Sequence, residues 1–444
     1  MIQPTRVHVL RPGEPARRPH VLLWVQATVR TRDNHALEYA VAEANRLGLP
    51  LVALFGLSRG YPEANARHYL YLLEGLRDLR RRLAERGVPL AVRPGHPPET
   101  VLEAARGAAL VVTDVGYLRL HREWRAWLAE RLDVPLTAVE SEALVPVRTA
   151  SPKAEYAART LRPKLHRLWP DYLVPLEPRE LSKQTADWDL GLDLSDPAGL
   201  CSTLPIDHSV LPGEERGGEG EALRRLDHFI RDELDLYHER RNDPNVHGSS
   251  RLSAFLHYGH LSPLTAALLA QERGGPGADA FLEELLVRRE LSFNLTTFNP
   301  RYDAYDGLPE WARQTLEVHR HDPREYLYSR EELDAAQTHD PYWNAAQNEM
   351  ARTGRMHNYM RMYWGKKVLE WSPDPRTAYD TLVWLNNRYE QDGREASSYA
   401  GIGWVFGLHD RPWARRPVFG TVRYMNAAGL RRKFDADAYA RRWA

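Results

Sequence analysis

The sequence predicts an α/β domain built on a parallel sheet, followed by an all-α domain. Between residues 20 and 145, short apolar segments alternate with segments of helical periodicity, which is the pattern of a parallel sheet with helices on both faces. From Glu221 onward, helical periodicity dominates. A chain of 444 residues accommodates two or three domains at roughly 100–200 residues each. We expect an α/β domain at 18–148, an inter-domain linker at 149–222 and a helical domain at 223–444.

The elements of the α/β half follow one another at regular intervals. Its expected strands are short apolar segments, and its expected helices carry apolar residues on one face, as at positions 36, 37, 40 and 41. The strands are expected at 20–28, 48–57, 88–95, 108–116 and 134–141, and the helices at 33–47, 64–86 and 97–107. The sequence contains neither a GxGxxG segment after a strand nor GxxxxGK[ST], which argues against the usual dinucleotide site and against P-loop chemistry.

The remainder of the chain divides in two. Residues 150–222 are rich in proline, glycine and acidic residues, which is typical of a long surface connection. Beyond them, six segments have the 3.6-residue periodicity of helices. These segments are 221–241, 251–259, 262–272, 280–295, 355–371 and 375–390. The C-terminal half is therefore expected to be almost entirely helical.

Composition excludes several classes of protein. The single cysteine, Cys201, leaves no internal disulfide and no cysteine-rich metal site. No HExxH or GxSxG occurs, so metal-dependent or serine hydrolysis has no motif to support it. No apolar segment is long enough for a membrane span, and the N-terminal segment lacks a secretory signal. We therefore expect a cytoplasmic protein without a metal centre.

Charge is balanced over the whole chain but not along it. Lys and Arg number 60, and Asp and Glu also number 60, which argues against a uniformly basic nucleic-acid-binding protein. Residues 403–444, however, carry nine Lys or Arg against three Asp. Trp413 lies among Arg411, Arg415, Arg416 and Arg423, an arrangement suited to stacking on bases beside phosphate contacts. A basic surface loop is the alternative interpretation.

Three segments of the helical half contain candidate functional side chains. HGSSRLS (247–253) places serines at a helix start, where they suit an anion site or merely cap the helix. FLEELLVRRELSFN (281–294) offers Glu284 either as a functional carboxylate or as part of a solvated helix face. In 353–371, Trp364 and Trp371 are seven residues apart and share one helix face. They are either functional side chains or part of an aromatic core.

Taken in order, the motifs of the C-terminal half resemble those of the photolyase/cryptochrome family. They are MHNYMRMYWGKKVLEW, LNNRYEQDGR, YAGIGW, HDRPW and RYM. The resemblance is strongest to the class II branch, the cyclobutane pyrimidine dimer photolyases, and covers about 225–440. Over 20–145 the resemblance is mainly architectural, since an α/β antenna domain precedes the helical flavin domain in the family.

The resemblance implies a flavin cofactor, FAD, bound in a bent shape within the helical domain. Arg361 and Asp392 would form an ion pair against the flavin ring, and the Asn386 amide would reach flavin N5. The other residues that it assigns to the cofactor hold the diphosphate (Tyr237, Ser249, Ser250, Arg251, Leu252 and Ser253) or face the ring and adenine (Asn358 and Gly393).

The reaction implied is light-driven DNA repair by electron transfer. Photoexcited FADH⁻ gives one electron to a cyclobutane dimer, the ring splits, and the electron returns; the protein supplies position and electrostatics. The dimer must first leave the stack of UV-damaged double-stranded DNA. Glu284 would hydrogen-bond the flipped bases. The other residues assigned to the lesion and its duplex are Met362 and Trp404, which would pack against the dimer, and Arg411, Trp413 and Arg423.

Three further expectations come from the resemblance. Trp364, Trp343 and Trp371 would carry electrons from the surface to oxidised flavin, assisted by Tyr328 and Tyr363. The antenna chromophore stays open between 8-hydroxy-5-deazaflavin and methenyltetrahydrofolate, because WVQATVRTRDNHAL matches the class II antenna pattern only loosely. The sequence also departs from some relatives by carrying Arg288 where they have a tryptophan beside the lesion.

Two alternatives of other classes remain at this point. A cryptochrome-like blue-light sensor would share the fold and FAD but would not repair DNA. An arginine-rich helical DNA-binding module fused to an α/β domain would bind no flavin. The combination of Glu284, Met362, Trp404, Arg411 and Trp413 favours repair. We expect a monomer that acts on damaged DNA.

Overall fold

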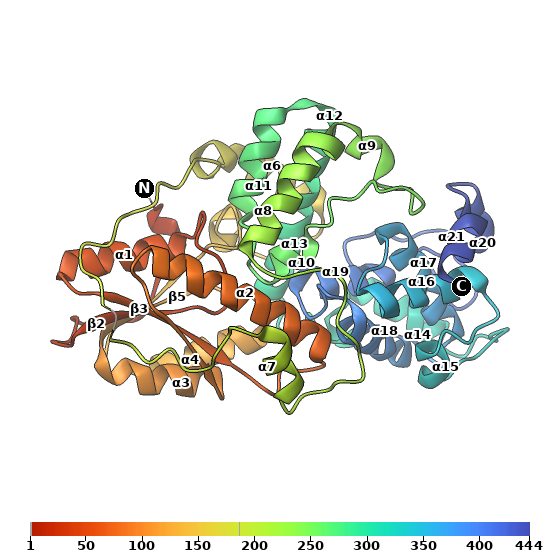
Figure 1. Cartoon of the computed structure of the whole chain (residues 1–444). Helices are drawn as coiled ribbons and strands as arrows, with labels where there is room; N and C mark the ends of the chain where they lie inside the picture. The colour runs from red at the N-terminus through yellow and green to blue at the C-terminus, as the bar shows by residue number, and fades with distance from the viewer. Residues whose placement is uncertain (1, 186) are drawn as a thin grey trace.

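The structure is a computed structural model that describes residues 2–185 and 187–444. Its N-terminal half is organised around a six-stranded sheet (Figure 1). The strand order is β1-β6-β5-β2-β3-β4. Strands β2 to β6 run parallel, and β1 pairs antiparallel with β6. The strands are β1 (Val7–Arg11), β2 (His20–Trp24), β3 (Leu51–Leu57), β4 (Leu90–Pro94), β5 (Ala108–Asp114) and β6 (Leu136–Val139).

Helices cover both faces of this sheet because its strands are apolar on both sides. Val21 and Leu23 point into one apolar cluster with α1 (His35–Leu47) and α2 (Ala66–Glu85). Leu22 and Trp24 point into the opposite cluster with α3 (Pro97–Ala104) and α4 (Arg119–Arg131). The α/β class expected from the sequence is therefore confirmed.

The edge strand β1 was not among the expected elements. Its sequence, VHVLR, has no regular alternation of buried and exposed residues. Pairing of Val7 with Val139 on β6 gives the strand its place, and such a long-range contact leaves no local pattern in the sequence. The antiparallel edge makes the sheet mixed rather than purely parallel.

The segment expected as a linker contains helices. They are α5 (Val147–Ala150), α6 (Ala158–Tyr172) and α7 (Pro197–Thr203). The buried side chains Leu161 and Leu165 of α6 join the same apolar cluster as Phe255 and Leu286 of the C-terminal half. This part of the segment therefore packs as part of the helical body, although α6 contains Pro163 and Pro170.

The C-terminal half is helical, as expected. Its α-helices are α8 (Glu219–His228), α9 (Tyr237–Arg240), α10 (Ser253–His257), α11 (Pro263–Arg273), α12 (Gly275–Leu282), α13 (Arg289–Phe298), α14 (Glu310–Val318), α15 (Arg330–Asp334), α16 (Pro341–Thr353), α17 (Asn358–Trp371), α18 (Pro375–Tyr389), α19 (Ala396–Val405), α20 (Ala427–Arg431) and α21 (Ala436–Trp443). Short 3₁₀ turns occur in both halves: η1 (Pro4–Arg6), η2 (Ala105–Gly107), η4 (Leu234–Leu236) and η6 (Tyr305–Gly307). The helical half also has the π-helical turns η3 (Phe229–Glu233) and η5 (Glu283–Arg288).

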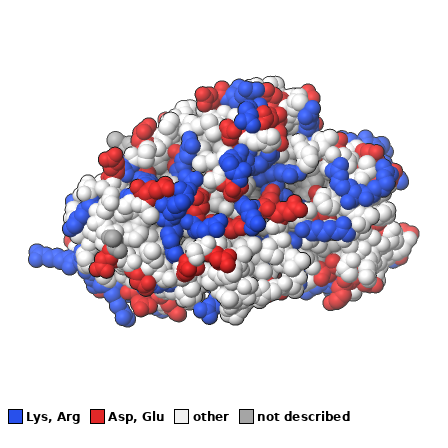
Figure 2. Space-filling model, viewed as in Figure 1, with Lys and Arg blue, Asp and Glu red and all other residues white. Residues whose placement is uncertain are grey.

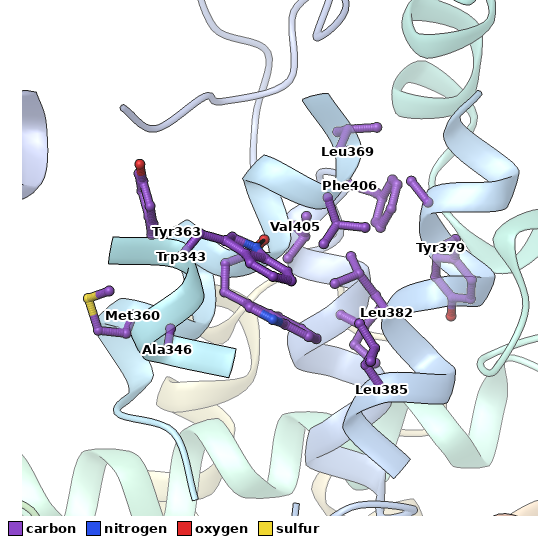
Figure 3. Packing of buried hydrophobic residues seen from close by; sticks show 14 of the residues in the cluster. Trp343, Ala346, Met360, Tyr363, Leu369, Tyr379, Leu382, Leu385, Val405 and Phe406 are labelled. Carbon is purple, nitrogen blue, oxygen red and sulfur yellow. Dashed lines mark hydrogen bonds between the residues drawn. The ribbon is translucent and has the colours of Figure 1, made fainter. Parts of the chain in front are cut away.

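Two apolar cores hold this half together. One joins α6 with the helices from α8 to η5. The other joins α14 to α21 and includes Trp343, Tyr363 and Phe406, shown in Figure 3. Within the described ranges, no helix is long and apolar enough to cross a membrane.

Candidate functional site

A cavity of the helical half lies between its two cores. It has a volume of about 490 Å³, within the range of small-molecule sites. Its walls come from α9, α10, η5 and α13 on one side and from α17, α19 and the 409–425 loop on the other. Ten residues expected from the sequence line it: Tyr237, Ser250, Ser253, Glu284, Asn358, Arg361, Met362, Asp392, Trp404 and Arg423.

One end of the cavity carries a buried group of charges. Nη2 of Arg361 lies 3.0 Å from Oε1 of Glu390 and 3.9 Å from Oδ1 of Asp392. Burial raises the pKa of Glu390 to about 8, against the attraction of Arg361. Burial also tends to raise the pKa of Asp392, but the Arg361 charge and a hydrogen bond from Ser253 outweigh it, so that pKa falls below its ordinary value. Asp392 is therefore the stable anion of the group.

Another part of the cavity lining is Glu284, which lies on a π-helical turn. The Arg289 amide donates to the Glu284 carbonyl five residues earlier, and such turns occur often at functional sites. Glu284 faces the cavity, where its Oε1 lies 2.6 Å from Nη1 of Arg241. The preceding Glu283 pairs instead with Arg162, at 2.6 Å. Two adjacent glutamates thus have different surroundings.

Trp404 and Met362 also line the cavity. Trp404 is 36% exposed, which is unusual for so large an aromatic side chain. The Arg288 guanidinium lies over its ring, 5.6 Å from the centroid. The position where some relatives have a tryptophan is thus filled by a cation stacked on another aromatic ring.

A basic aromatic rim surrounds the mouth of the cavity. Trp413 is 41% exposed and lies between the guanidiniums of Arg411 and Arg423, at 5.3 and 5.1 Å from its ring centroid. Asp410 accepts a hydrogen bond from its indole N–H at 3.2 Å. Arg423 and Asp410 also line the cavity, so Trp413 lies at its edge. Figure 2 shows further Lys and Arg gathered beside α20 and α21.

The three tryptophans expected as an electron path lie together in the core behind the cavity. The rings of Trp364 and Trp343 are stacked with centroids 6.5 Å apart, and Trp343 is 5.9 Å from Trp371. The indole of Trp343 donates to the Trp364 carbonyl at 3.0 Å, and that of Trp364 donates to Gln347 at 3.0 Å. Helices α16 and α17 therefore bring these residues within contact of one another.

Besides the three core tryptophans, seven expected residues lie outside the cavity lining: Ser249, Arg251, Leu252, Asn386, Gly393, Arg411 and Trp413. The first three flank the lining serines in one loop, and Leu252 is buried in the core. Asn386 is 2% exposed, and its amide nitrogen lies 3.4 Å from Oδ1 of Asn387. Gly393 packs against the Asn386 carbonyl so closely that a Cβ atom there would lie 2.8 Å from that oxygen.

Three lining or neighbouring residues were not identified from the sequence. Arg241 pairs with Glu284, Glu390 pairs with Arg361, and Lys366 lines the cavity while donating to the Val405 carbonyl. Burial lowers the pKa of Lys366 to about 7. Arg241 and Glu390 lie in the segments YHERR and LNNRYEQDGR, where their charge could have marked them as candidates. Their ion-pair partners, Glu284 and Arg361, become evident only from the fold.

A smaller cavity of about 130 Å³ lies where the two halves meet. Phe55, Tyr61 and Trp124 line it from the α/β half, and Tyr258 and Arg394 from the helical half. Burial raises the pKa of Tyr258 to about 12, so its hydroxyl stays protonated.

The two cavities share a wall. Nδ1 of His257, in the smaller cavity, lies 3.6 Å from the carboxylate of Glu395, in the larger one. Among the described residues, no cluster of His, Cys, Asp and Glu suits a metal ion.

Comparison with known proteins identifies the family. Residues 21–181 match the family model described as DNA photolyase. A deoxyribodipyrimidine photo-lyase from Methanothermobacter thermautotrophicus is 48% identical over 443 residues, covering 100% of this chain and 98% of that protein. The chain belongs to the DNA photolyase family. A deoxyribodipyrimidine photo-lyase from Arabidopsis thaliana is 39% identical, over 99% of this chain and 92% of its own length.

Solved structures of the photolyase and cryptochrome group share the fold. A cryptochrome from Synechocystis has a TM-score of 0.76, covering 97% of this chain and 89% of that one at 18% identity. An archaeal photolyase from Sulfolobus tokodaii has a TM-score of 0.72, covering 96% and 90% at 18% identity. It is described with two FAD molecules and the implication of a novel light-harvesting cofactor. At these identities the likeness establishes the fold alone.

The residues of the large cavity fit the FAD that photolyases bind. Its lining mixes hydroxyl and amide groups with apolar side chains, as a dinucleotide with an aromatic ring requires. Nε of Arg361 is buried without a hydrogen-bond partner among the described residues, although Nη2 of the same guanidinium pairs with Glu390. Buried polar atoms of this kind normally have partners, and a polar heterocycle beside them would provide them.

Proposed function

We propose that this photolyase uses light to split cyclobutane pyrimidine dimers in UV-damaged double-stranded DNA, with FAD in the large cavity. One observation carries the proposal: a single cavity is lined both by the charged side chains Arg361 and Asp392 and by Glu284, Met362 and Trp404. The first group suits a flavin dinucleotide and the second a flipped, partly apolar pyrimidine dimer.

Hydroxyl, amide and charged side chains of the cavity would hold the cofactor. Tyr237, Ser250 and Ser253 would bind the diphosphate with hydroxyl groups, and Asn358 the ring and adenine side. Arg361 and Asp392 would face the flavin ring as a fixed pair of charges. Once bound, reduced FAD supplies the light-driven electron that opens the cyclobutane ring. The protein contributes position and a preset electrostatic field.

Glu284 and the side chains around it would receive the dimer. A damaged pair costs less to flip out of the stack than an intact one. The Glu284 carboxylate and its partner Arg241 would hydrogen-bond the polar edge of the flipped bases. Met362 and Trp404 would pack on their apolar faces, while Trp413 and Arg423 at the rim would brace the duplex.

The stacked tryptophans would maintain the active redox state. Trp364, Trp343 and Trp371 form a continuous series of aromatic contacts. They would conduct electrons toward flavin that has become oxidised. The order of the motifs in the sequence supports placing the chain in the class II branch.

The small cavity would hold an antenna chromophore. Its aromatic walls and its position between the two halves suit a planar ring such as 8-hydroxy-5-deazaflavin, with methenyltetrahydrofolate as the other candidate. We propose further that the enzyme is a monomer in the cytoplasm. Light scattering of the purified protein tests the oligomeric state.

A repair assay tests the proposed function. Purified protein with reduced flavin is mixed with duplex oligonucleotides that carry one cyclobutane dimer, and parallel samples are kept in light or darkness. We expect loss of dimers in light only. A flavin-containing protein that leaves the dimers intact in light would instead support a sensor, and a colourless protein would support the DNA-binding module.

A further inference from the structure

The segment that joins the two halves begins with an excess of positive charge. Residues 148–167 contain six Lys or Arg and one acidic residue, Glu155. Lys164 pairs with Glu155, and Arg162 pairs with Glu283. The other four cations, here named the basic strip, are exposed and have no ion-pair partner among the described residues: Arg148, Lys153, Arg159 and Arg167. Unpaired charges of one sign on one short segment favour an anionic partner.

The loop that carries Lys153 is fixed on the helical half. The side chain of Asn294, on α13, donates to the Lys153 carbonyl at 2.9 Å and accepts from the Glu155 N–H at 2.7 Å. Helix α6 begins three residues after Glu155, and its buried Leu161 and Leu165 pack in the core of that half. The backbone of the strip therefore holds one position without a ligand.

Tyr156 connects this loop to the basic aromatic rim of the large cavity. Its carbonyl accepts a hydrogen bond from Nδ1 of His409 at 2.8 Å, and its hydroxyl donates to the Asp410 carbonyl. The Asp410 carboxylate accepts from the indole of Trp413. Both His409 and Asp410 line the cavity. Tyr156 is 46% exposed, so the strip and the rim form one continuous surface around it.

A second contact joins α6 to the cavity. Nη2 of Arg162 and Nε of Arg288 lie 2.6 and 3.2 Å from the same carboxylate oxygen of Glu283. Arg288 lines the cavity and lies over the ring of Trp404. The first turn of α6 is therefore next to the side chains that would receive the dimer.

We propose that the basic strip is a second DNA-contact surface, which binds backbone phosphates of the duplex beside the flipped dimer. The inference rests on the proposed function, which places that dimer in the large cavity. Lys153 and Arg159 lie three residues before and after Tyr156, so their Cα atoms are within about 11 Å of it. Each strand has a phosphate about every 3.4 Å along the duplex, so both cations can reach nucleotides close to the lesion.

The chemistry of the strip suits duplex DNA. Lysine and arginine contacts to phosphates fix the position of a duplex without reading its sequence, as repair of a lesion in any sequence requires. The hydrogen bonds of Tyr156 place these cations beside Trp413 and its arginines. The strip would thus extend the contact with the duplex from the 409–425 loop to the segment between the two halves.

Salt-dependent binding in darkness tests the proposal. The affinity of the holoprotein for a dimer-bearing duplex and for the undamaged duplex is measured between about 50 and 200 mM salt. Combining Lys153→Gln with Arg159→Gln should reduce the slope of log affinity against log salt concentration by about 1.8, at about 0.9 per phosphate. Affinity for both duplexes should fall by the same factor, because phosphate contacts do not read the lesion. A wild-type slope in this variant would overturn the proposal.

A matched control removes two cations elsewhere. Arg17 and Arg106 are exposed, have no ion-pair partner among the residues that the structure describes, and precede β2 and β5 at the amino ends of these strands. Arg17→Gln with Arg106→Gln lowers the net charge equally and should keep the wild-type slope. An equal reduction of the slope in both double variants would show a general charge effect and would also overturn the proposal.

Disulfide trapping in darkness gives a readout that does not depend on affinity. Cys201, the only cysteine, is buried, so Lys153→Cys in Cys201→Ser protein introduces one reactive thiol. It should form a disulfide with a thiol tethered to a phosphate beside the dimer, and Arg17→Cys should not. No disulfide from Lys153→Cys, in protein that retains FAD absorbance, would overturn the contact. Repair by wild-type protein is measured separately: absent repair rejects the proposed function, whereas intact repair with a wild-type slope in the strip variant rejects this inference.

Discussion

Replacing Glu284 by glutamine tests how the cavity recognises a dimer. The carboxylate and its partner Arg241 are 37% and 30% exposed, so in the free protein their pairing is worth at most about 1 kcal/mol. When a flipped dimer covers them, a hydrogen bond to a charged group is worth about 1.5–3 kcal/mol. At about 1.4 kcal/mol per factor of ten, Glu284→Gln should lower repair at limiting DNA concentration about 10- to 100-fold.

The adjacent glutamate provides the control. Glu283 occupies the same turn but lies outside the cavity lining, where its carboxylate pairs with Arg162 and Arg288. Because the glutamine oxygen can still accept a hydrogen bond from either arginine, Glu283→Gln should leave repair within about twofold of wild type. The assay measures dimers lost per absorbed photon in protein with equal FAD absorbance. Equal losses in both variants, or no loss in Glu284→Gln, would refute the assigned role. Combining Glu284→Gln with Arg241→Gln should give a non-additive loss, since the pair acts together.

Three further predictions concern the buried charges and the tryptophans. Arg361→Gln leaves Glu390 and Asp392 buried without their cation and should lower the free energy of unfolding by about 3–5 kcal/mol. Urea denaturation of the apoprotein measures this free energy, and an unchanged denaturation midpoint would contradict the prediction. Because the pKa of Glu390 is raised to about 8 in the folded state, the folded state retains a proton that the unfolded state releases, so stability should fall as pH rises from about 4.5 to about 8. Glu390→Gln should flatten that slope, and an equal slope in both proteins would count against the buried acid. Trp364→Phe should block photoreduction of oxidised FAD while repair by chemically reduced protein continues; photoreduction at the wild-type rate would exclude this path.

The sheet and its helices were predictable because their sequence signals are local. Strands such as LVALFGL are apolar throughout, and Asn34 precedes α1 and caps it by accepting from Leu37. The edge strand β1 and the helix α6 were not predictable in this way. Their positions depend on partners far along the chain, such as Val139 for Val7.

The candidate site likewise combines features that the sequence predicts with features that only the fold reveals. Trp364 and Trp371 were expected to share a helix face, and the resemblance assigned Trp343 to the same path. Only the structure shows that Trp343, from another helix, lies between them. Charge pairs were less predictable, since Arg361 lies nearer to Glu390 than to the expected Asp392. The resemblance singled out Glu284, whereas periodicity alone could not separate it from Glu283. The π-helical turn gives the two carboxylates different partners, Arg241 for Glu284 and Arg162 for Glu283.

The central claim is that light drives a repair in which no electrons are consumed. The most direct measurement counts dimers opened per bound flavin under continuous light, with reduced protein, excess dimer-bearing duplex and no added reductant. The account predicts many dimers opened per flavin in light and none in darkness. One dimer or fewer per flavin, or equal loss in darkness, would contradict it.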